Sequence, residues 1–114
     1  MDNVVINVFN IVGSPFSVEA GDGQKVFDLI HKAFREKKKV VLSFLNVEIL
    51  TTAFLNSAVG QLYKDFSEAE IKQNLEVKDI TQPGAVALKR VVDTAKLYYK
   101  NPDAMEKSIN ALLD

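Results

Sequence analysis

The sequence contains no cysteine, which excludes disulfide bonds, thiolate zinc sites and cysteine nucleophiles. Its only histidine is His31, and no cluster of His, Asp and Glu residues with the spacing of a metal site or a catalytic dyad is apparent around it. No run approaches the roughly 18 apolar residues that a membrane span needs. Asp2 stands where a signal peptide would carry basic residues. We therefore expect a cytoplasmic protein with no metal, no cofactor and no membrane contact.

The sequence also has almost no net charge: the formal charge of the 114 residues is −1 at pH 7. A nearly neutral chain has no general attraction to nucleic acid, so we expect no nucleic-acid partner. The only basic cluster is residues 35–39, Arg-Glu-Lys-Lys-Lys, where a helix is expected to end. Cations there complement the helix dipole, which favours a solvated helix end over a phosphate-binding patch. The length and the apolar fraction of 47% are typical of one soluble domain.

Two short strands are expected near the N-terminus. Alternating apolar residues indicate a first strand from Asn3 to Phe9, and residues 16–18 alternate again. Because Gly13-Ser14-Pro15 has the composition of a turn, we expect these strands to form an antiparallel hairpin.

Two amphipathic helices follow. The first begins after residues 21–23, with Asp22 as the expected N-cap. Its apolar residues have helical spacing and are Val26, Leu29, Ile30, Ala33 and Phe34. The second spans about residues 52–66, with the apolar residues Leu55, Ala58, Val59, Leu62, Tyr63 and Phe66. Gly60 interrupts this helix, which we interpret as close packing against a neighbouring element.

The remaining elements complete an α/β fold. Residues 40–44 predict a central strand covered on both faces, and residues 75–80 predict another strand. A third helix begins at Pro83, and a last helix spans residues 102–113. The expected order is β-β-α-β-α-β-α-α, a mixed sheet of about four strands with helices packed on it, where helix-linked strands are parallel. We expect one domain over residues 1–114, in which the last helix packs either on this domain or on another chain.

No motif of an enzyme is present. Gly21-Asp22-Gly23 lacks the further glycines and the lysine of a phosphate-binding loop, so we interpret it as a turn into a helix. Ser43 and Ser57 lack the Gly-x-Ser-x-Gly context of a serine nucleophile. The tyrosines lie at helical spacing, which places them in the core or at its rim. We therefore expect no catalytic residue and no enzymatic activity.

The most informative stretch is residues 40–63, where a buried strand leads through a linker into Thr51 and Thr52 at the start of a helix. Their hydroxyl groups suit helix capping, and the free N–H groups of a helix start bind anions, phosphate or partners. Residues 40–55, VVLSFLNVEILTTAFL, resemble the STAS fold of bacterial anti-sigma-factor antagonists. Residues 50–63, LTTAFLNSAVGQLY, resemble more closely the STAS-like domains of unknown function, which usually show Ile-Thr-x-Ser-Phe followed by a helix with Gly and Leu at this spacing.

This resemblance implies a STAS-like fold and a regulatory interaction module instead of an enzyme. STAS domains bind anti-sigma factors that are also serine kinases, and phosphorylation at this helix start breaks the complex. The phosphorylated serine falls on Ala53, which cannot accept phosphate, so Thr52 is the candidate phosphoacceptor. The linker residues 46–48 border the expected docking face. That face comprises Thr51, Thr52, Ala53, Phe54, Asn56 and Ser57.

The expected partner is an anti-sigma factor or a histidine-kinase-type ATPase in a bacterial signalling system. The alternative is a sensor domain that binds an anionic small molecule or a nucleotide at the same corner. The sequence leaves the identity of the partner and the oligomeric state open.

Overall fold

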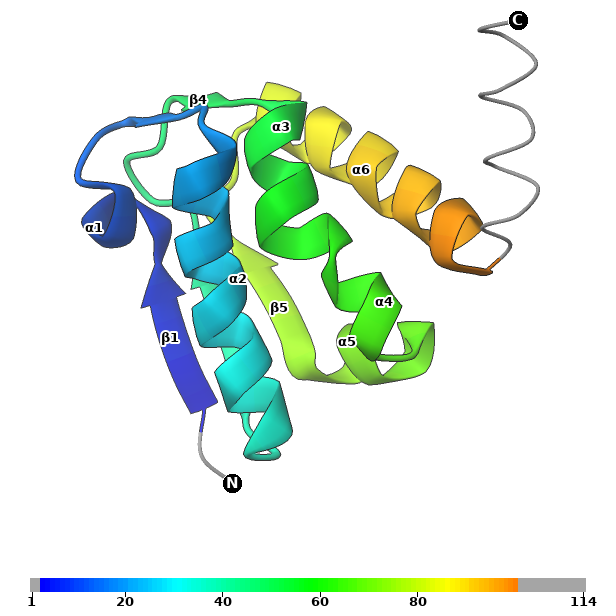
Figure 1. The fold of residues 1–114 in the computed structure, drawn as a ribbon. Helices are drawn as coiled ribbons and strands as arrows, with labels where there is room; N and C mark the ends of the chain where they lie inside the picture. The colour runs from blue at the N-terminus through cyan, green and yellow to red at the C-terminus, as the bar shows by residue number, and fades with distance from the viewer. Residues whose placement is uncertain (1–2, 101–114) are drawn as a thin grey trace, which may run out of the picture.

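The structure, a computed structural model, describes residues 3–100 and contains a parallel three-stranded sheet with helices on one face (Figure 1). Strands β1 (Asn3–Asn7), β3 (Lys39–Ser43) and β5 (Leu75–Lys78) form this sheet, with β3 in the middle. Strands β2 (Phe16–Ser17) and β4 (Ile49–Leu50) pair separately, also in parallel. The prediction that strands linked through helices are parallel is confirmed.

The helices of the described part are α1 (Val8–Val12), α2 (Ala20–Arg35), α3 (Thr52–Leu55), the π-helical turn η1 (Asn56–Gly60), α4 (Leu62–Asp65), α5 (Glu68–Asn74) and α6 (Gln82–Lys100). Helix α2 and the continuous segment α3–η1–α4 lie side by side over one face of the sheet (Figure 1). Helix α6 packs against η1 and α3. The core lies between this helical layer and the sheet, where Phe44, Phe54, Ile30, Leu42, Leu55 and Leu62 are fully buried.

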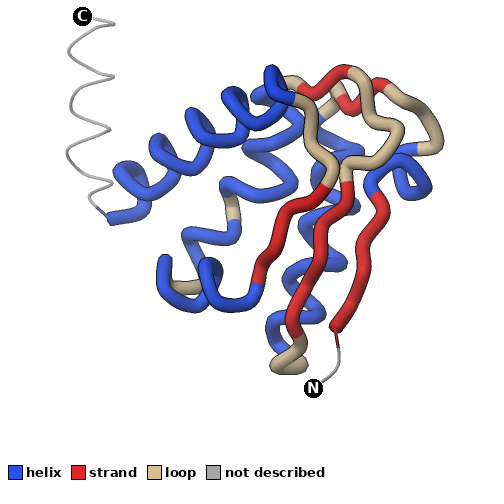
Figure 2. The backbone as a smooth tube through the Cα atoms, turned by 180° about the vertical axis from the view of Figure 1, so that it is seen from behind, coloured by secondary structure: helices blue, strands red, loops and turns tan. Residues whose placement is uncertain are grey.

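The opposite face of the sheet is bare, since no helix within residues 3–100 crosses it (Figure 2). Val40 and Leu42 are buried on the helical side, whereas Val5 on the bare side is 67% exposed. The prediction that residues 40–44 are covered on both faces is therefore wrong. The strand order advances in one direction, from β1 to β3 to β5, and right-handed crossovers then place every connecting helix on the same face.

The predicted N-terminal hairpin is also wrong. Strand β1 ends at Asn7, whose side-chain oxygen accepts a hydrogen bond from the Asn10 N–H at 3.2 Å and caps α1. Gly13 ends this short helix with φ of 75°, a left-handed conformation that suits glycine. The glycine at 13 therefore terminates a helix, and β2 pairs with β4 instead of β1.

Helix α2 begins earlier than predicted. Glu19 precedes its first residue, so Asp22 lies inside the first turn and is not the N-cap. Gly21 and Gly23 are helical residues and do not form a turn. A Cβ at Gly23 would collide with the Phe54 carbonyl oxygen and lie 2.9 Å from the Ser57 Cβ, so this glycine allows α2 to pack closely on α3 and η1.

The helical segment over residues 52–66 is present, with a π-helical middle turn. The predicted close packing at Gly60 is confirmed, because a Cβ there would lie 3.4 Å from Val91 Cγ1 and 3.9 Å from Ala95 Cβ on α6. Helix α6 carries Pro83 in its first turn, as predicted. The predicted last helix, residues 102–113, lies outside the described residues.

Candidate functional site

A groove of about 460 Å³ lies between the α3–η1 segment and the C-terminal half of α6. Three of the predicted contact residues, Ala53, Asn56 and Ser57, line one wall, and Tyr98 and Tyr99 at the end of α6 line the other. We call it the α3–α6 groove, and its residues are Ala20, Ala53, Asn56, Ser57, Gly60, Gln61, Thr94, Ala95, Tyr98 and Tyr99.

Thr51 is held in place by its own hydrogen bonds. Its hydroxyl oxygen accepts from the Phe54 N–H at 3.2 Å, and its hydroxyl donates to the Val18 carbonyl at 2.8 Å. Its N–H donates to the Ser17 carbonyl at 3.2 Å. Thr51 is thus the N-cap of α3 and ties this helix start to the end of β2.

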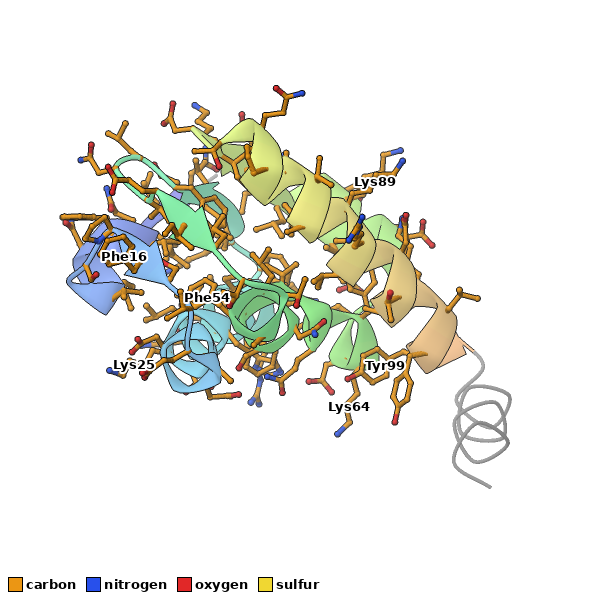
Figure 3. The ribbon with its side chains drawn as sticks, turned by 90° about the horizontal axis from the view of Figure 1, so that it is seen from above. Phe16, Lys25, Phe54, Lys64, Lys89 and Tyr99 are labelled. Carbon is orange, nitrogen blue, oxygen red and sulfur yellow. The ribbon has the colours of Figure 1, made fainter. Side chains whose placement is uncertain are left out.

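The neighbours of Thr51 differ in exposure. Thr52 and Ala53 are exposed on the first turn of α3, so both are accessible to a partner. Phe54 is 0% exposed and lies in the interior between the helices and the sheet (Figure 3). Val47 of the linker is also buried. Phe54 therefore belongs to the core, and only the other five predicted residues offer surface to a partner.

The π-turn η1 forms part of the groove wall. The Gln61 N–H donates to the Asn56 carbonyl at 3.2 Å, a spacing of five residues instead of four. Such widened turns often occur at functional sites. Here the turn buries Ala58, Val59 and Gly60 together and leaves Asn56 exposed at the groove.

A side-chain network joins α2 to η1 beside the groove. Gln61 Nε2 donates to Gln24 Oε1 and to the Ser57 carbonyl, each at 2.8 Å. Gln24 Nε2 in turn donates to Asp28 Oδ1 at 3.0 Å. These bonds hold the Gln61 amide in one position on the groove wall.

Tyr98 and Tyr99 form an edge-to-face pair with ring centroids 4.9 Å apart. Tyr99 projects from the end of α6 (Figure 3). Burial raises the pKa of Tyr99, and the neighbouring Tyr98 and Asp65 raise it further. The Tyr99 hydroxyl therefore stays protonated at neutral pH and is able to donate a hydrogen bond into the groove.

The groove offers little to an anion. None of its lining residues carries a charged side chain. The Phe54 and Leu55 N–H groups at the helix start already donate to the side chain and the carbonyl of Thr51. Within residues 3–100, no three His, Asp or Glu side chains gather closely enough to hold a metal ion. The lining of the groove therefore suits uncharged groups better than anions.

His31 and Ser43 make contacts within the fold, away from the groove. His31 Nε2 lies 3.3 Å from Asp65 Oδ2, and its ring packs against Phe27 and Phe66. The Ser43 hydroxyl oxygen accepts from the Leu45 N–H at 3.3 Å. Neither residue lines the α3–α6 groove.

Sequence reasoning missed the α6 side of the groove and Gln61. The adjacent tyrosines carried one usable signal, because neighbouring helical residues point about 100° apart. At least one ring of such a pair therefore tends to face away from the centre of the core. The position of Gln61 depends on the π-turn, which leaves no recognisable local signal.

Replacing Thr51 by alanine is expected to lower the free energy of unfolding by about 1–2 kcal/mol, because the cap and the bond to Val18 are both lost. Thr52→Ala is the matched control and should change it by less than about 0.5 kcal/mol, since its side chain is exposed. Urea unfolding curves measure both values. Equal losses in the two variants would contradict the assignment of Thr51 as the cap.

A model of the family described as "STAS-like domain of unknown function (DUF4325)" matches residues 22–85. The match runs from the first turn of α2 into the first turn of α6 and includes the whole α3–η1–α4 segment. No curated protein and no solved structure matches the chain. No helix within residues 3–100 has both the length and the apolar character needed to cross a membrane.

Proposed function

Because the chain belongs to the family of STAS-like domains of unknown function, we propose that it is a non-enzymatic regulatory module that docks a signalling protein in the α3–α6 groove. The proposed partner is an anti-sigma factor or a histidine-kinase-type ATPase. Ala53, Asn56 and Ser57 supply one wall of the docking site, and Thr51 and Thr52 directly precede Ala53 at the start of α3.

One observation carries this proposal, namely the composition of the groove. Its small residues leave room for a side chain of a partner, and its walls carry the amide groups of Asn56 and Gln61 and two tyrosines. Tyrosines are enriched in protein–protein interfaces, and buried anchor side chains supply most of their binding energy. The uncharged lining gives less support to the alternative, an anionic small molecule or a nucleotide.

The test begins with a photo-crosslinking residue at Asn56 in the native host, with the same residue at Lys89 on α6, outside the groove, as the control. Recovery of one ATPase-type kinase or anti-sigma factor from the Asn56 position alone supports the proposal. Equal recovery from both positions contradicts it. Phosphate mapped by mass spectrometry after incubation with that kinase tests Thr52 as the phosphoacceptor.

Ala53→Arg is then expected to weaken binding of that partner at least about tenfold, because it places a long cation at the groove. Ala69→Arg, on an exposed residue of α5, is the matched control and should bind as the wild type does. Titration calorimetry measures both affinities. If ATP or phosphate instead raises the melting temperature by several degrees and Thr52→Ala removes this effect, the anionic-ligand alternative replaces the docking proposal.

A further inference from the structure

Strand β1 has a free edge. It stands at one end of the order β1-β3-β5, so every second residue directs its backbone N–H and C=O groups away from β3. Proteins usually protect such edges with charged residues, proline or a bulge. The sequence of β1, Asn-Val-Val-Ile-Asn, has no charge and no proline. Its edge is thus open to pairing with a further strand.

A groove of about 470 Å³ runs along this edge between β1 and α2, which lie side by side at one margin of the molecule (Figure 1). No residue of β3 or β5 lines it, so it lies on the outer side of β1. Leu29 on α2 faces it and is 42% exposed. We call it the β1–α2 groove, and its residues are Val4, Val5, Ile6, Asn7, Asn10, Ile11, Leu29, Lys32, Ala33, Glu36 and Lys38.

The charge along this groove is positive. Glu36 is paired with Lys38, with Oε2 and Nζ 3.2 Å apart. Lys32 has no carboxylate within ion-pair distance among residues 3–100. Lys38 belongs to the basic run at residues 35–39 and lines the groove, as Lys32 does. Lys32 and Lys38 against Glu36 therefore leave the groove with one positive charge in excess.

We propose that the β1–α2 groove binds an extended, acidic peptide segment of another protein, which adds a strand to the free edge of β1. Backbone hydrogen bonds to β1 hold the segment, and alternate apolar side chains pack on Leu29 and Ala33. A carboxylate of the segment faces Lys32. This site shares no residue with the α3–α6 groove and is independent of the function proposed for it.

The first test selects short random peptides, displayed on phage, against the full chain. Peptides with alternating apolar residues and at least one Asp or Glu are expected to be enriched. N-methylation of alternate amide nitrogens in a synthetic copy of the most enriched peptide removes strand hydrogen bonds and keeps its side chains. It should lower the affinity, measured by fluorescence anisotropy, by at least about tenfold. Absence of enrichment, or an affinity unchanged by N-methylation, would overturn the proposal.

Two variants locate the peptide. Leu29→Glu should weaken binding at least about tenfold, because it replaces an apolar contact by a carboxylate that repels the acidic peptide. Lys32→Glu should weaken binding about fivefold, because it reverses the charge that faces the carboxylate of the peptide. Lys25→Glu, on the same helix but outside the groove, should bind as the wild type does. Equal binding by all three variants would place the peptide elsewhere and overturn the proposal. Sedimentation that shows self-association of the chain, lost in Leu29→Glu, would also overturn it, because a second copy would then occupy the edge.

Discussion

Gly23→Ala is expected to lower the free energy of unfolding by about 3 kcal/mol, which is a severe loss for a domain of this size. The added methyl group would collide with the Phe54 carbonyl oxygen and lie 2.9 Å from the Ser57 Cβ. The carbonyl belongs to the backbone of α3, so relief requires α2 and the α3–η1 segment to separate. Such separation would weaken packing throughout the helical layer.

Gly21→Ala is the matched control for this prediction. It lies two residues earlier on the same helix, and a Cβ there meets no atom within 4 Å. Alanine also has the higher helix propensity, so this variant should be neutral or gain up to about 1 kcal/mol. Chemical denaturation of both variants measures the contrast. If Gly23→Ala is as stable as Gly21→Ala, α2 does not approach the π-turn as closely as described.

Phe54→Ala is expected to lower the free energy of unfolding by about 3–5 kcal/mol, because the ring is 0% exposed and its removal leaves a cavity in the core. The residue lies between Ala53 and the π-turn, so the same cavity would disturb the wall of the α3–α6 groove. Calorimetric unfolding measures the loss, and the melting temperature should fall by roughly ten degrees or more.

Phe54→Leu separates the core role from a contact role. Leucine keeps much of the buried apolar volume, so its cost should be smaller, about 1–2 kcal/mol. At a temperature where this variant is folded, it should bind the partner as the wild type does, because the side chain does not reach the surface. A large loss of binding with little loss of stability would show that Phe54 is a contact residue after all.

The elements that could be predicted from the sequence are helices whose apolar spacing repeats over several turns and strands whose residues are nearly all apolar. Helix α2 and the strand at residues 40–44 are of this kind. Residues 8–12 are not, because five residues are too few for helical and alternating patterns to differ. There the deciding signals were Asn7 as a cap and Gly13 as a terminator.

The candidate site was predictable only on its α3 side, where the strand-to-helix corner identified Thr51 and the exposed residues after it. Phe54 could not be separated from them, because the burial of one residue in the first turn depends on how the helix lies on the sheet. The far wall depends on the close approach of α6, which Gly60 allows by its contacts with Val91 and Ala95, and such contacts join residues far apart in the sequence. The π-turn was equally hidden, since residues 55–62 fit an ordinary helical stripe.

The exclusively parallel pairing of the main sheet also has a kinetic consequence. Asn3 pairs with Lys39 and Val40 pairs with Leu75, so no strand of this sheet has a neighbour that is close in sequence. Each pairing must close a long loop before it gains any contact, which slows folding relative to a chain of local hairpins or helices. During synthesis, β1 leaves the ribosome before β3 and is able to pair only after β3 has followed. Throughout that interval, the backbone N–H and C=O groups of β1 are unpaired, and none of its side chains carries a charge.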